Sequence, residues 1–159
     1  MSQESAGPVR TQKPLELILA RNLIANISAP AFLADYRATL VFYNEAAGAL
    51  LGIPFEHAGN MDREEWAARF GPFDGAGERI PFEEVPLTIA LREGRPVHAP
   101  LYIHSAKGKV HHIEVTAFPL ASSVGVTGAI GIFWPTEQAP SAGEGRAVKV
   151  PPEVAGLSE

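Results

Sequence analysis

The sequence predicts an α+β domain built on one antiparallel five-stranded sheet, with short helices covering one face of that sheet. Three observations predict this class. Residues 97–134 form three runs of alternating apolar and polar side chains separated by Gly-containing turns, which indicates three consecutive antiparallel strands. Two shorter strand-like runs precede position 44, and the residues between carry helix signals. A chain of 159 residues suffices for one domain with a buried core.

The first element expected is an amphipathic helix over residues 14–28. Residues 1–13 are polar and contain Gly and Pro, so we expect them to be disordered. Pro14 is favoured in a first helical turn. An apolar stripe at helical spacing follows it, formed by Leu17, Ala20, Ile24 and Ile27. This stripe packs either on the chain's own sheet or on a partner chain, as a dimer interface.

The next elements are two strands and several short helices. Strands are expected over 31–34 and 39–43, and Asn44 is expected to cap a helix over 45–51. A further helix is expected over 61–71. Asp62 and Glu65 have the spacing of a capping box at its start. Another helix lies within residues 81–93, with Pro86 in its first turn.

The register of the first C-terminal hairpin follows from its apolar pattern. A three-residue turn, Lys107 to Lys109, sets Ile103 opposite Ile113 and keeps apolar side chains together. The predicted apolar face carries Leu101, Ile103, Ile113, Val115 and Ala117; the predicted polar face carries Tyr102, His104, His112, Glu114 and Thr116. A second turn is expected at 124–128, before a strand over 129–134. Residues 138–159, rich in Ala, Gly, Pro and Glu, are expected to be a disordered tail or linker.

Composition excludes several classes of function. The net charge is −5, with both signs scattered, so nothing indicates a nucleic-acid partner. There is no cysteine, which excludes disulfides, thiolate metal sites and cysteine nucleophiles. No apolar run approaches a membrane span, and Met1 to Arg10 lacks the apolar core of a signal peptide. We therefore expect a cytoplasmic protein without a membrane partner.

Three segments together resemble the PAS domain family. They are DYRATLVFYNEAA at 35–47, PFEEVPL with the helix that follows it at 81–94, and GKVHHIEVTAFPL at 108–120 with Gly125, Gly128 and Gly131 after it. The resemblance covers roughly residues 23–137 and implies a PAS domain over 29–137. Ala38 stands where the family usually has a turn glycine, which predicts a strained or differently built turn. The chain resembles a stand-alone PAS protein or a fragment of a longer sensor.

The resemblance implies a pocket between the sheet and the helices. The residues expected to line it are Phe42, Trp66, Phe70, Ile89, Ile113, Val115 and Ile130. They either surround a ligand or fill the core completely. The absence of cysteine excludes a covalent flavin or chromophore adduct. Haem is disfavoured because residues 85–94 hold no histidine. His98, which follows that helix, and His111, which shares the predicted inner face with Ile113, are the candidates for a polar or axial contact. For both, an ordinary hydrogen-bonded histidine is the favoured interpretation. The sequence does not identify a cofactor.

The remaining polar residues do not predict catalysis. Two imidazoles and a carboxylate, His104, His112 and Glu114, share the polar face and could hold a metal, but a solvated sheet face is the favoured interpretation, so no metal site is predicted. No nucleophile elbow or phosphate-binding loop is present, and we do not expect an enzyme.

The sequence-based hypothesis is a sensory PAS module. It binds a small, mainly apolar molecule in an internal pocket and relays binding through a homodimer or a signalling partner. The alternative is an interaction and dimerisation module without a ligand, and a haem-binding sensor is a third and weaker interpretation.

Overall fold

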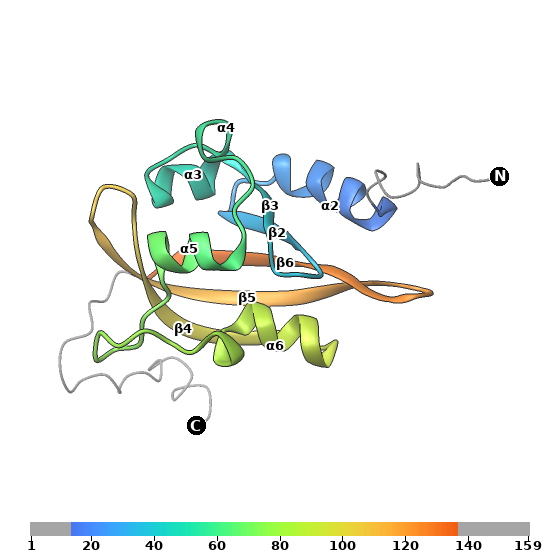
Figure 1. Ribbon diagram of the computed structural model, residues 1–159. Coiled ribbons are helices and arrows are strands. Elements are labelled where there is room, and N and C mark those ends of the chain that lie inside the picture. The colour runs from blue at the N-terminus through green and yellow to red at the C-terminus, as the bar shows by residue number, and fades with distance from the viewer. Residues whose placement is uncertain (1–13, 137–159) are drawn as a thin grey trace, which may run out of the picture.

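The computed structural model describes residues 14–136 of the chain (Figure 1). The two segments expected to be disordered, 1–13 and 138–159, lie outside the described residues. In the described range no helix is both long enough and apolar enough to cross a membrane.

The sheet has five antiparallel strands, as predicted. In chain order they are β2 (Ala31–Asp35), β3 (Leu40–Tyr43), β4 (Val97–His104), β5 (Val110–Ser122) and β6 (Gly125–Pro135). Their spatial order is β3-β2-β6-β5-β4, so the last three strands form a meander and the first hairpin adds to its far edge. Because β2 pairs with β6, the two halves of the chain share one continuous sheet.

The helices lie mostly between the two groups of strands. They are α2 (Leu15–Ala25), α3 (Glu45–Leu51), α4 (Phe55–Ala58), α5 (Arg63–Phe70), the 3₁₀ turn η1 (Phe82–Glu84) and α6 (Pro86–Glu93). Their predicted starting signals are confirmed. The Asn44 side chain caps α3, Asp62 and Glu65 form the capping box of α5, and Pro86 is the first residue of α6. The short α4 was not predicted.

The two faces of the sheet bury different helices. On the inner face, side chains from α3, α5 and α6 form one apolar cluster with the strands; Figure 1 shows α5 and α6 lying over them. On the outer face, α2 forms a second cluster. Neighbouring residues of β2 show the division, because Leu33 packs with α2 while Ala34 belongs to the inner cluster. The amphipathic helix therefore packs on its own chain, on the face opposite the short helices.

The predicted register of β4 and β5 is wrong by two residues. Leu101, not Ile103, lies opposite Ile113, and Ile103 lies opposite His111. The connection spans five residues because the hydroxyl of Ser105 accepts hydrogen bonds from the backbone N–H groups of Lys107 and Lys109, both at 3.1 Å. A shift of two leaves every side chain on its own face. The predicted apolar face is accordingly buried as expected.

The second turn is also tighter than predicted. β5 ends at Ser122 and β6 starts at Gly125, so Gly128 lies within the strand rather than in the turn. Gly131, farther along β6, faces the ring of Phe32, and a side chain there would overlap that ring. The glycine is required because the aromatic ring crosses directly over the strand.

Candidate ligand pocket

A pocket of about 100 Å³ lies between the inner face of the sheet and the helices. The strands contribute Phe32, Leu40, Leu101, Ile103, Ile113, Val115 and Phe133. The segments above the sheet contribute Leu51, Trp66, Phe70, Val85, Pro86 and Leu87, with the Gly71–Pro72 pair. All of these residues except Phe32, which is half-buried, are buried. The pocket is therefore lined by side chains of the core.

Strand alternation explains the floor of this pocket. Leu101 and Ile103 on β4, and Ile113 and Val115 on β5, stand at every second position and face the same side. Phe133 pairs directly with Val115 across β5 and β6 and extends the apolar floor to the neighbouring strand. Its ring lies 6.1 Å from that of Phe32.

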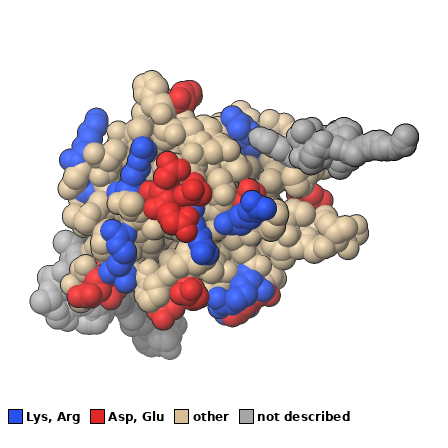
Figure 2. Space-filling view, viewed as in Figure 1, with Lys and Arg blue, Asp and Glu red and all other residues tan. Residues whose placement is uncertain are grey.

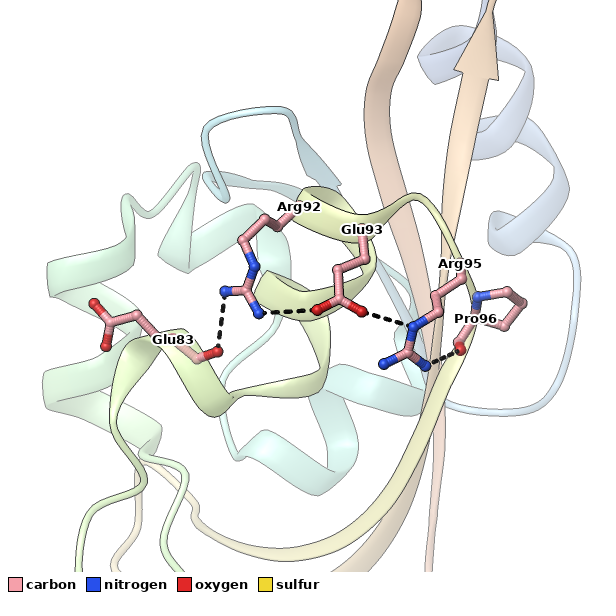
Figure 3. Close-up of polar contacts among 5 residues, drawn as sticks. All are labelled: Glu83, Arg92, Glu93, Arg95 and Pro96. Atoms are coloured by element: carbon pink, nitrogen blue, oxygen red, sulfur yellow. Dashed lines mark hydrogen bonds and ion pairs between the residues drawn. The ribbon is translucent and has the colours of Figure 1, made fainter.

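The roof depends on two short helices. Trp66 and Phe70 are one turn apart on α5, so both rings reach the same face of that helix. At the start of α6, Pro86 fixes the backbone and Leu87 points to the core. At its far end, Arg92 donates to the carbonyl of Glu83 at 3.3 Å, which holds η1 beside α6 (Figure 3).

Charged groups stay on the outside of this roof. Glu93 pairs with Arg95 at 2.7 Å and with Arg92 at 3.2 Å (Figure 3). Hydrogen bonds from Arg95 and then Arg92 lower the pKa of the Glu93 carboxyl. Figure 2 shows Lys, Arg, Asp and Glu side chains interspersed over the face drawn in Figure 1, so neither sign dominates it.

One polar side-chain atom belongs to the lining, and it is already bonded. The indole N–H of Trp66 donates to the carbonyl of Ala38 at 2.8 Å. Ala38 has a positive φ of 69°, a conformation that costs a residue with a side chain about 1–2 kcal/mol. The expected irregular turn at this position is therefore present. The Asp35 carboxylate also supports it, because it accepts from the N–H groups of Arg37 and Thr39.

The structure brings four of the seven predicted lining residues together: Trp66, Phe70, Ile113 and Val115 line the pocket. The other three lie elsewhere. The Phe42 ring packs edge-on against Phe55 at 5.4 Å and lies under the Arg21 guanidinium at 4.2 Å. Ile130 packs with α2 on the outer face, and Ile89 is half-buried on α6 outside the lining.

Several lining residues were missed by the sequence analysis. Leu101 and Ile103 carried a usable signal, because the alternation had already placed them on the apolar face. Leu40 and Leu51 carried a weaker one, since both are ordinary apolar residues in predicted elements. Phe133 could be recognised only from its pairing with Val115, which depends on the register of β6.

The histidines lie apart from the pocket. His111 is half-buried at the start of β5, where burial, and to a smaller extent Lys109, lowers the pKa of its imidazole. On the outer face, His98 contacts Glu114 and Thr116, each at 2.7 Å. The other two outer histidines stack on aromatic rings, His104 on Phe73 and His112 on Tyr102. Within residues 14–136 no three His, Cys, Asp or Glu side chains gather as a metal site would require.

The residues predicted as a dimer interface are covered by the chain itself. Leu17, Ala20 and Ile24 are buried against the outer face, and Ile27 is partly buried beside them. The opposite side of α2 is apolar as well and is open to solvent. We call it the outer stripe, formed by Leu15, Ile18, Leu19 and Leu23, with exposed fractions of 45–63%.

Known structures of PAS domains have this arrangement. The PAS domain of BvgS from Bordetella pertussis matches with a TM-score of 0.53 at 17% identity, over 77% of this chain and 87% of that domain. The PAS domain of nitrogen regulation protein NR(II) from Vibrio parahaemolyticus matches with a TM-score of 0.54 at 13% identity, over 74% and 98% of the two chains. This protein has the PAS fold.

A wider stretch of this PAS fold matches the LOV protein of Rhodobacter sphaeroides. That match has a TM-score of 0.61 at 13% identity and covers 84% of this chain and 75% of that one. No protein-family model and no curated protein matches the sequence. At these identities the similarity shows the fold, and the function must be argued from the residues.

Proposed function

We propose that the protein is a sensory PAS module that binds a small, mainly apolar molecule in the inner pocket. The pocket is the observation that carries this proposal. An apolar space inside a domain costs stability unless a ligand fills it, by about 24 cal/mol per Å³ in well-studied cases. The space of about 100 Å³ bounded by Trp66, Phe70 and Phe133 therefore favours an occupant.

The lining argues against haem as this ligand. Haem iron is held by His, Cys, Met or Tyr side chains. None of these residue types is among the lining residues. His98 and His111, the candidates from the sequence, are not among them either.

The signal would leave the domain through a second copy of the chain or through a signalling partner. The outer stripe of α2 supports this step. Leu15, Leu19 and Leu23 expose 63%, 58% and 60% of their surface along one side of the helix. A contiguous apolar surface of this kind is typical of an interaction site. The same stripe is the observation that favours the alternative, an interaction module without a ligand.

Two measurements test these steps separately. Thermal unfolding against a library of small apolar compounds tests ligand binding, because a ligand that binds the folded state raises the midpoint. Light scattering on the full chain tests association. We expect Leu19→Glu and Leu23→Glu to weaken a dimer more than tenfold, because each places a charge in the interface.

The matched control for the association test is Val124→Glu. Val124 is 86% exposed at the tip of the β5–β6 hairpin and lies outside the outer stripe. The Val124→Glu substitution should leave the mass of the protein in solution unchanged. If the wild-type chain stays monomeric over the whole range of concentrations measured, the homodimer is contradicted. The outer stripe would then have to bind a different protein. A library without a single stabilising compound would favour the ligand-free alternative.

A further inference from the structure

We propose that the ligand is a compact, uncharged molecule without hydrogen-bonding groups, of the size of a single-ring hydrocarbon. This inference rests on the proposed function, because it describes what the inner pocket would take. It goes further than a general preference for apolar molecules. It excludes molecules that place a polar or charged group among the lining residues, and it excludes fused-ring cofactors.

The first argument is the chemistry of the lining. Every lining side chain is aliphatic, aromatic or proline, apart from the glycine at position 71. The single polar side-chain atom is the indole nitrogen of Trp66, and its proton is used in the bond to Ala38. A ligand hydroxyl or carboxylate in the pocket would therefore lose its bonds to water and find no partner in exchange.

The second argument is the burial of the lining. Here the residues on both sides of the pocket are buried, with Leu101, Phe70 and Val85 only 5–6% exposed. The backbone at Pro72 is also engaged, since its carbonyl accepts from Ile80 at 3.0 Å. A molecule that occupies the pocket therefore contacts side chains of the core rather than of the surface.

The third argument is size. Pockets for drug-sized ligands and organic cofactors measure about 300–1,000 Å³. The inner pocket measures about 100 Å³. A dry, apolar cavity of about 150 Å³ in another protein binds benzene or xenon. A single ring is therefore close to the upper limit here, and a three-ring flavin or a haem would require the helices to separate from the sheet.

The test measures binding to the full chain with five probes: benzene, phenol, benzoate, naphthalene and flavin mononucleotide. The readout is the NMR signal of the indole N–H groups. The chain has two tryptophans, of which Trp66 lines the pocket and Trp134 is 41% exposed on the outer face. The Trp134→Phe variant assigns the two signals. Binding in the pocket shifts the Trp66 signal and leaves that of Trp134 in place.

We expect benzene to shift the Trp66 signal in a saturable way. Phenol should bind about tenfold or more weakly, because burying one unpaired hydroxyl costs that much. Benzoate, naphthalene and flavin mononucleotide should leave the Trp66 signal unchanged. If phenol or benzoate binds as tightly as benzene, the claim that the ligand has no hydrogen-bonding groups is overturned. If naphthalene or flavin mononucleotide binds, the size limit is overturned. Any of these results would still be consistent with the proposed function, a module that binds a small molecule.

Failure of the proposed function gives a different result. If no probe shifts the Trp66 signal, both the ligand class and the ligand-binding function are overturned. A pair of variants confirms the location when benzene does bind. Leu87→Phe fills the pocket and should weaken benzene at least tenfold, whereas Leu91→Phe, one turn later on α6 and outside the lining, should not. Circular dichroism establishes that both variants fold.

Discussion

The side-chain amide of Asn44 donates to the carbonyl of Ile24 at 2.9 Å, so the residue that begins α3 also holds the end of α2. The same amide donates to the carbonyl of Ala29 at 2.8 Å. Its oxygen accepts from the N–H of Ala31 at the start of β2 and from the N–H of Ala47 in α3. Asn44 is only 3% exposed, and it connects three elements that meet at one end of the sheet.

Asn44→Ala should therefore cost more than the loss of a helix cap. The cap alone is worth about 1 kcal/mol, and the orphaned carbonyls of Ile24 and Ala29 each add a desolvation cost. We expect a loss of about 2–4 kcal/mol in the free energy of unfolding, measured by urea denaturation. The exposed Asn60→Ala is the control and should change it by less than 0.5 kcal/mol, roughly the range of surface substitutions. Equal losses in the two variants would contradict this role.

The left-handed backbone at Ala38 can be tested with glycine. Ala38 and Ala90 are both buried, at 2% and 0% exposure, so Ala→Gly removes one buried methyl group from each. Ala90 lies inside α6, where glycine costs about 1 kcal/mol more through helix propensity. At Ala38 the glycine instead relieves about 1–2 kcal/mol of backbone strain. Denaturation should show that Ala38→Gly is better tolerated by at least about 1 kcal/mol; similar losses would mean that the turn is unstrained.

Thr88 carries a buried hydroxyl without a hydrogen-bond partner in the described structure. Valine has nearly the same shape and no hydroxyl. Because an unsatisfied buried group costs about 1–3 kcal/mol, Thr88→Val should raise the free energy of unfolding by about 1 kcal/mol. In the control Thr116→Val, the hydroxyl removed is one that contacts His98, and no gain is expected. A destabilised Thr88→Val would show that the hydroxyl has a partner.

His111 should make the fold sensitive to mild acid. Burial lowers the pKa of its imidazole in the folded state below the usual 6.5, so the unfolded chain binds the proton more readily. The contribution to stability is complete above about pH 6.5 and is lost as the pH falls through the folded-state pKa. Thermal midpoints between pH 8 and pH 5 should fall more steeply for the wild type than for His111→Gln. Parallel curves would remove His111 as the source.

Much of the fold was predictable because local signals and burial agree. The caps at Asn44 and Asp62 and the proline at the start of α6 each mark a helix boundary that the structure keeps. The apolar and polar faces of β4 and β5 follow from an alternation of two residues. The predicted register was wrong because a shift of two residues keeps every side chain on the same face, so the alternation cannot distinguish the two registers. The contacts that decide between them are those of the Ser105 hydroxyl within the turn.

The site was less predictable than the fold. Ile130 is an apolar strand residue like Val115, yet its side chain packs against α2 on the outer face. Successive residues of β6 point to opposite faces, so the face of Ile130 depends on the register of that strand. The sequence offered no sign that α2 would use the opposite face of the sheet from the other helices. Phe42 was misplaced for a related reason, since its partner Phe55 belongs to the unpredicted α4.

The burial of Leu17, Ala20 and Ile24 also sets where this protein can be cut. A version starting at residue 29 would keep every strand and the whole pocket. It would also leave Leu33 and Ile130 uncovered on the outer face, since α2 is what shields them from water. Any shortened form prepared for crystallography or ligand screening should therefore begin no later than Pro14.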